Sequence, residues 1–227
     1  ALPSLDIPAF YDDRQFTQEF QLLFEGDRIH GVAGLYYLDA RASGAFDTVV
    51  GALGATTLTS GTVKTKSYAA FADFSFDVTE QLKLSAGLRY TKDDKTGTVF
   101  RRNYLGLRSP LFGNATAIPL LIRTDYTNDR SFEKLTPRVS ISYQPNDNAN
   151  IYASYGKGFK SGGFDMRGDA VFTPTTVNGY EPETIDSFEV GFKGAFLDRT
   201  LFTNVALFKS KYKNQQVTVQ VPSLAGG

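Results

Sequence analysis

Cysteine and tryptophan are absent from the 227-residue chain, and histidine occurs once, as His30. Without cysteine there is no disulfide framework, no thiolate metal site and no cysteine nucleophile. A single histidine also argues against a metal centre built from several imidazoles. We therefore expect no metal, no cofactor and no classical metalloenzyme chemistry. The lack of tryptophan counts slightly against a membrane β-barrel, whose interfacial aromatic belts are rich in it.

Neither sign of charge is in excess, because 24 Lys and Arg balance 24 Asp and Glu. This balance, with 41% hydrophobic residues, excludes a disordered polyelectrolyte and a basic nucleic-acid binder. No run of about 18 apolar residues occurs, which excludes a transmembrane helix. A membrane strand needs only about 9 to 11 residues with one apolar face. The N-terminal stretch ALPSLDIPAFYDDR lacks the pattern of a signal peptide, so we expect that one was removed or that the chain starts midway.

The abundant residues favour strands and turns, since there are 19 Phe, 12 Tyr and 21 Gly. Apolar and polar residues alternate with period two over LKLSAGLRYTK (82–92). Alternation recurs in paired segments: 16–24 with 29–41, 68–76 with 82–92, 135–143 with 151–155, and 187–196 with 201–213. Both faces of 201–213 carry apolar residues, so its orientation stays open. The sequence predicts an all-β fold of eight antiparallel, up-and-down strands.

The connections between these segments alternate between short and long. Tight turns are predicted near residues 26, 79, 147 and 199, and long connections at roughly 42–65, 93–130 and 161–184. An outer-membrane barrel has short turns at one rim and long loops at the other, whereas a soluble β-sandwich has no such segregation. The pattern favours the barrel over the sandwich. Pro137 lies within a predicted strand and donates no ladder bond, so we expect a bulge or local break there.

The two faces of the predicted strands differ in character. We expect one face to contact lipid, with Leu84, Leu88, Val139, Ile141, Val190 and Phe192. We expect the other face to line a wet lumen, with Arg89, Arg138, Glu189 and Lys193. Tyrosines near strand ends on the apolar face are typical of the interfacial belt of a membrane barrel: Tyr68, Tyr90, Tyr143 and Tyr155.

Several stretches resemble the barrel of TonB-dependent outer-membrane receptors: LSAGLRYTKDDK (84–95), NIYASYGKGFKSGGF (150–164) and YEPETIDSFEVGFKGAFLDRTLFTNVALF (180–208). FTQEFQLLF and GVAGLYYLD (16–39) extend the similarity. The resemblance implies a transmembrane β-barrel of 22 strands in the bacterial outer membrane, plugged by an N-terminal domain. It also implies import of scarce nutrients such as ferric siderophores, energised by the TonB complex.

The sequence departs from the pattern of the whole receptor, because we find no plug domain, no TonB box and no terminal aromatic residue closing a last strand. We therefore expect residues 1–227 to be part of one barrel domain, an internal segment of about eight strands. A closed barrel of eight strands is geometrically possible. Long charged side chains on the lumen face suit a wider barrel better.

Basic and aromatic residues mark a candidate ligand site in the connection 93–130: Arg101, Arg102, Tyr104, Arg108, Arg123 and Tyr126. This mixture suits an anionic or aromatic ligand such as an iron chelate, and equally the phosphates of lipopolysaccharide. Lys157 and Lys160 in GKGFKSGG (156–163) would attract an anionic ligand. That run lacks the spacing of a phosphate-binding loop, and we expect a flexible strand exit instead.

No other cluster predicts catalysis. The pairs Asp12–Asp13 and Asp93–Asp94 have the pattern of solvated charges, residues 146–148 suit a tight turn, and no nucleophile motif accompanies His30. We expect a transport receptor and not an enzyme, with lipid, lipopolysaccharide, the TonB complex and a small ligand as partners and no nucleic acid. A structural or adhesive barrel, or a porin-like channel, is the alternative. Siderophore, cobalamin, haem and oligosaccharide receptors share this barrel pattern, so the ligand is not readable.

Overall fold

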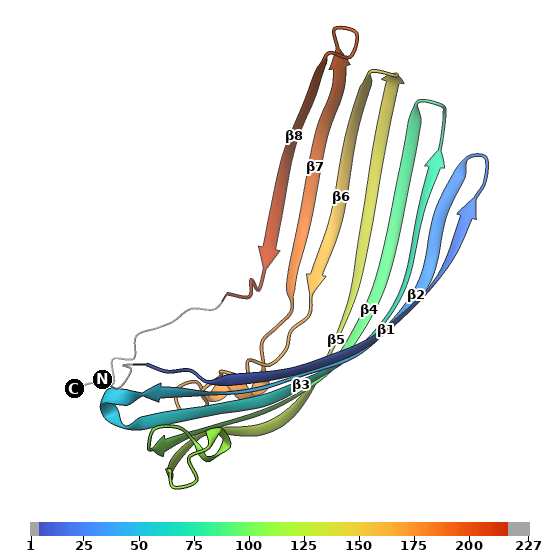
Figure 1. Cartoon of the computed structure of the whole chain (residues 1–227). Coiled ribbons are helices and arrows are strands. Elements are labelled where there is room, and N and C mark those ends of the chain that lie inside the picture. Colours follow the sequence, from blue (N-terminus) through green and yellow to red (C-terminus); the bar gives the residue numbers. More distant parts are fainter. Residues whose placement is uncertain (1–4, 218–227) are drawn as a thin grey trace.

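The computed structural model describes residues 5–217. Eight strands form one antiparallel sheet in chain order (Figure 1). Their bounds are β1 Ala9–Glu25, β2 Ile29–Val50, β3 Ala55–Asp77, β4 Leu82–Leu105, β5 Ile118–Asn146, β6 Ala149–Lys160, β7 Glu183–Phe196 and β8 Leu201–Lys213. Three short 3₁₀ turns lie between strands: η1 Gly51–Leu53, η2 Pro110–Phe112 and η3 Pro174–Asn178. The predicted all-β, up-and-down order is confirmed.

The four tight turns lie together at one end of the sheet, where the alternation predicted them (Figure 1). The turn after β5 consists of Asp147 and Asn148, and the backbone N–H of Asn148 donates to Asn146 Oδ1 over 3.0 Å. Asparagine bonds its own backbone in this way in Asx turns. The turn after β7 places Leu197, Asp198 and Arg199 at positive φ. We call the end of the sheet that carries these four turns the short-turn end.

At the opposite end of the sheet, which we call the long-loop end, two of the three predicted long connections are wrong in extent. β2 and β3 run through most of 42–65 and are joined by only four residues, Gly51–Gly54. β4 and β5 likewise occupy most of 93–130, leaving residues 106–117 as the connection. These segments carry polar residues on both faces and therefore lack alternation, yet a backbone ladder forms regardless of which solvent each face meets. The third connection, 161–182, is close to the predicted range.

Pro137 marks a break on one side of its strand only. Toward β4 it pairs with Leu88 without a register shift. Toward β6 the ladder ends at the next residue, where Arg138 pairs with Gly156. Because proline has no N–H to donate, the ladder to β6 does not continue past it. The expected local break is confirmed, and the bulge is not found there. Beyond this point β2–β5 curve away from β6–β8 (Figure 1).

Register confirms the two faces, because directly paired residues point to the same side. On the apolar face Leu84 pairs with Ile141, and Ala153 pairs with Val190. The register also orients β8, which the sequence left open. Leu207 pairs with Val190 and therefore shares the apolar face. Phe208 pairs with Glu189 and lies on the polar face. We call the apolar side the outward face and the polar side the inward face.

A single sheet buries few side chains. The small buried cluster of Leu58, Tyr104 and Ala117 lies near the long-loop end and is covered by Phe100 and Phe112. Within residues 5–217, β1 and β8 are the two edges of an open sheet. Unpaired strand edges cannot be satisfied in lipid. Residues 5–217 contain no helix that is long and apolar enough to cross a membrane.

Candidate functional site

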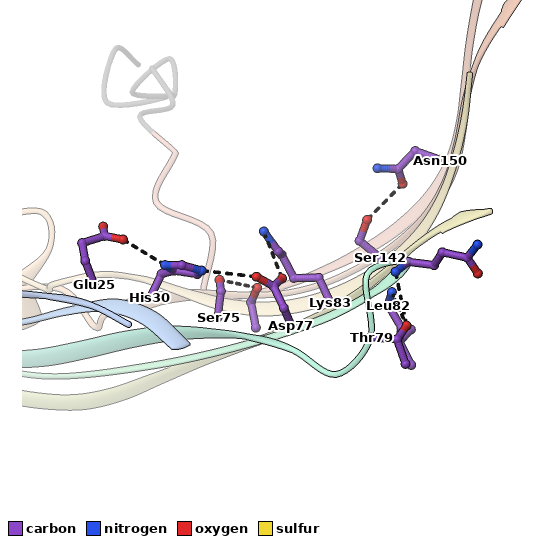
Figure 2. Close-up of polar contacts among 11 residues, drawn as sticks. Glu25, His30, Ser75, Asp77, Thr79, Leu82, Lys83, Ser142 and Asn150 are labelled. Atoms are coloured by element: carbon purple, nitrogen blue, oxygen red, sulfur yellow. Dashed lines mark hydrogen bonds and ion pairs between the residues drawn. The ribbon is translucent and has the colours of Figure 1, made fainter. Parts of the chain in front are cut away.

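A chain of charged side chains crosses the inward face at the short-turn end (Figure 2). His30 lies between two carboxylates, with Nδ1 2.9 Å from Glu25 Oε2 and Nε2 3.2 Å from Asp77 Oδ2. Lys83 extends the chain, since its Nζ is 3.3 Å from Asp77 Oδ1. These contacts occupy both ring nitrogens of His30. The arrangement links β1, β2, β3 and β4.

A second group of polar contacts lies further along the inward face. Arg138 on β5 reaches across β4 to Asp73 on β3, with Nη2 2.6 Å from Oδ1. The pair passes directly over Gly87, where a Cβ would overlap the Asp73 carboxylate. Arg89 stacks on Tyr36 and Phe71 at 5.3 and 5.5 Å from the ring centroids. A charged wall of this kind fits a water-filled or protein-filled lumen.

The connection between β6 and β7 folds back onto the inward face at the long-loop end, and we call residues 161–182 the inner loop. Its main anchor is Asp169, which lies against two arginines. Arg123 Nε donates to Asp169 Oδ2 over 2.6 Å, and Arg101 Nη1 lies 3.6 Å from the same oxygen. A register shift between Arg101 and Arg102 makes Arg123 an extra residue of β5, which turns it toward the inner loop. Arg101 Nη1 also donates to the carbonyl of Arg167 over 2.8 Å.

An aromatic anchor lies beside this ion cluster. Phe164 is only 5% exposed, packs against Tyr126 and sits over Gly97, whose Cβ would overlap the Phe164 ring. Further along, Arg130 donates to the carbonyl of Asn178 over 3.0 Å and to Glu181 Oε1 over 2.7 Å. The inner loop is therefore attached along its length to β4 and β5.

A pocket of about 1010 Å³ opens between the inner loop and the inward faces of β1–β3. Its charged lining residues are Lys160, Asp165, Arg167 and Glu181. Arg167 Nε is 3.2 Å from Asp165 Oδ1, whereas Lys160 has no carboxylate within ion-pair distance among residues 5–217. Tyr180 also lines the pocket, and burial together with Asp165 raises the pKa of its phenol. The pocket thus offers a free ammonium group and a neutral phenol donor.

The structure separates the residues that the sequence grouped as ligand candidates. Arg101, Arg123 and Tyr126 come together beneath the inner loop and contact it. Lys160 lines the pocket.

The other candidates lie elsewhere. Arg102 stacks on Tyr104, which is 8% exposed and belongs to the buried cluster near Ala117. Arg108 Nη2 lies 3.5 Å from Asp6 Oδ2. Lys157 lies on the outward face and pairs with Asp186 at 3.4 Å.

Sequence reasoning missed Asp169, Phe164 and Tyr180, which hold the inner loop or line the pocket. They lie in irregular structure, where no periodic pattern identifies a contact. The glycine-rich stretch around Gly162 and Gly163 was a signal, because a Cβ at either position would crowd Phe132 or Tyr180. It indicated close backbone approach, although the sequence alone favoured a flexible strand exit.

The chain forms an open antiparallel sheet with one apolar face, one polar face and a loop folded onto the polar face. This is the architecture of part of the wall of a membrane β-barrel. Residues 4–227 match the family described as TonB dependent receptor-like, beta-barrel. The chain belongs to this family, which places it in the bacterial outer membrane.

Two curated relatives and a solved structure show the range of similarity. The chain is 27% identical over 153 residues to the probable TonB-dependent siderophore receptor PiuA of Acinetobacter baumannii, covering 66% of this chain and 18% of that protein. It is 31% identical over 117 residues to the metal-pseudopaline receptor CntO of Pseudomonas aeruginosa, covering 50% of this chain and 15% of that protein. The fold resembles the ferric yersiniabactin uptake receptor FyuA of Yersinia pestis, with a TM-score of 0.74, 16% identity, and coverage of 95% of this chain and 31% of that one.

Proposed function

We propose that the protein containing this chain is an outer-membrane receptor that takes up a ferric siderophore with energy supplied through TonB. The observation that carries the proposal is the pocket under the inner loop, which faces the lumen at the long-loop end. In outer-membrane barrels this end is extracellular, so a ligand arriving from outside meets the pocket first. The relatives support the proposal, since PiuA is described as a siderophore receptor and CntO as a metal-pseudopaline receptor.

The chemistry of the pocket suits a compact chelate that carries negative charge. Lys160 supplies a cation that has no carboxylate within ion-pair distance among residues 5–217, and Tyr180 supplies a hydrogen-bond donor. Ion pairs within the wall, such as Arg123 with Asp169, keep the inner loop in place and leave Lys160 for the ligand. A volume of about 1010 Å³ is at the upper limit of usual small-molecule sites.

The chain supplies one sector of the barrel wall in this proposal. β1 and β8 must pair with strands outside the described residues, because their free edges are not tolerated in lipid. The larger barrel is then of the 22-stranded kind, and TonB acts through a plug domain that lies outside residues 1–227. The chain spans less than a third of FyuA, which leaves room for both parts.

Uptake by a receptor-deleted strain tests the proposal. The full receptor should restore growth on at least one ferric siderophore as sole iron source, and deletion of TonB should abolish that growth. Lys160→Gln should raise the apparent ligand Kd, whereas Lys157→Gln, which changes an outward lysine, should not. TonB-independent permeation of unrelated solutes would favour a porin-like channel and contradict the proposal.

A further inference from the structure

A second hollow lies on the outward face, away from the lumen and the inner loop. It has a volume of about 660 Å³ and is formed by β1, β2 and β3. Four of its lining side chains are cations, Arg14, Arg41, Lys64 and Lys66, and one is a carboxylate, Asp39. All four cations are exposed. We call this group the outward basic cluster.

The strand register places like charges directly beside one another. Arg14 pairs with Arg41 across β1 and β2, and Arg41 pairs with Lys64 across β2 and β3. Like charges on directly opposed positions destabilise a sheet. Among residues 5–217, no carboxylate lies within ion-pair distance of any of the four. Lys66 is directly opposed to Asp39 and Asp94, whereas the other three cations form a row in which no member is directly opposed to a carboxylate. An external anion would neutralise this row.

The position of the cluster identifies the kind of anion. Three aromatic rings lie on the same face one step nearer the short-turn end, with Tyr37 5.2 Å from Tyr68 and 6.4 Å from Phe16, measured between ring centroids. Such rings mark the interface between the hydrocarbon and the polar headgroups. Below them the outward face is apolar, with Phe20 and Leu35 exposed. The cluster therefore lies at headgroup level in the external leaflet.

The neighbouring strands provide an internal contrast. On the same face, Lys92 of β4 lies two residues beyond Tyr90, as Lys66 lies two residues from Tyr68. Lys92 has a partner within the sheet, since its Nζ is 3.4 Å from Glu133 Oε1 on β5. The row formed by Arg14, Arg41 and Lys64 has no such partner among residues 5–217.

We propose that the outward basic cluster binds the phosphate groups of lipopolysaccharide in the external leaflet. Three adjacent strands spread the cations over about 10 Å, enough to contact more than one phosphate. Arginine binds phosphate through paired N–H groups, and lysine binds it as a point charge. The aromatic rings below would pack against the first part of the acyl chains. The inference concerns the outside of the barrel and does not depend on the transported ligand.

The test uses the full receptor, purified in detergent, with diphosphorylated lipid A as the probe. Binding is measured by native mass spectrometry for the parent, for Arg41→Glu/Lys64→Glu and for the matched control Lys92→Glu. Each basic residue near an anionic surface contributes about a factor of five, so the double variant should bind at least roughly 20-fold more weakly. The Lys92→Glu receptor should bind like the parent.

Three results would overturn the proposal: equal binding by the double variant, equal weakening by Lys92→Glu, or binding of dephosphorylated lipid A or of phosphatidylglycerol as tight as that of the probe. Folding is checked by the heat-dependent gel mobility of the barrel. If the double variant does not fold, Arg41→Gln/Lys64→Gln removes the two charges without adding carboxylates and is held to the same outcomes.

Discussion

The two halves of the sheet differ in how polar and apolar side chains are distributed between its faces. In the half nearest the short-turn end, apolar and polar side chains alternate, as at Leu88 on the outward face and Arg89 on the inward face. In the half nearest the long-loop end, strands continue with polar residues on both sides, and Thr98 faces outward while Gly97 receives the inner loop. Alternation thus reports where the two faces meet different solvents. It does not report where strands begin and end.

The two halves are also stabilised differently. The short-turn half has its outward apolar side chains largely exposed, and lipid is the solvent that suits them. In the long-loop half, the inner loop packs against the sheet through Phe164 and Asp169, so the contacts there resemble those of a soluble domain. We therefore expect the same kind of substitution to cost different amounts of stability in the two halves, even on the same strand and face.

The largest effect is expected for Leu88→Arg in the full receptor. This change puts a charge into the lipid-facing band and should lower the free energy of unfolding by about 2–4 kcal/mol. The matched control is Thr98→Arg, ten residues further along β4 on the same face, which should cost little because that position meets water. Urea unfolding in lipid vesicles measures both. Equal losses would show that the boundary between the halves is misplaced.

Asp169→Asn should have the next largest effect, and only in the long-loop half. It removes the negative charge between Arg101 and Arg123, both of which are mostly shielded from water. Hydrogen bonds to charged groups contribute about 1.5–3 kcal/mol, so local opening of the inner loop should become easier by that amount. Hydrogen exchange of residues 161–182 measures it. Unchanged exchange there would mean that the loop is held by other contacts.

Gly97→Ala should loosen the same loop by about 1–2 kcal/mol, through overpacking against Phe164. Gly156→Ala adds the same methyl group at a position where a Cβ meets open space. Limited proteolysis should cleave the inner loop faster in the first variant and at the parental rate in the second. Identical cleavage of both variants would contradict the close packing of Phe164 over Gly97.

The smallest effect is expected for Lys92→Gln at the border between the halves. The Lys92–Glu133 pair is exposed on both sides, with 41% and 52% of the two side chains accessible. Exposed pairs contribute about 0.2–1 kcal/mol. The loss of unfolding free energy should therefore be well below that of Leu88→Arg, measured by the same urea titration. A loss comparable with Leu88→Arg would place Lys92 inside the lipid band.

Sequence alone predicted the strands, their order, the tight turns and, for every strand except β8, the two faces, because these follow from local alternation. It could not predict the extended ends of β2–β5, since polar residues on both faces look like loop. It grouped six basic and aromatic residues of 93–130 as one site, and the structure brings only Arg101, Arg123 and Tyr126 together, against the inner loop. The partner of Arg123 is 46 residues away, and no periodic signal connects such positions.

The central claim is that β4 crosses from lipid into water at about Tyr90. Residues 1–227 contain no cysteine, so single cysteines can be introduced along residues 82–105 and spin-labelled in the full receptor once any cysteine outside residues 1–227 has been replaced by serine. Accessibility to oxygen, which concentrates in lipid, should alternate with period two from Leu82 to Tyr90, high at Leu84 and Leu88 and low at Arg89. Beyond Asp94 both faces should instead be accessible to a water-soluble nickel complex, apart from sites under the inner loop. Oxygen-dominated alternation that continues to Leu105, or none at all from Leu82 onward, would contradict the account.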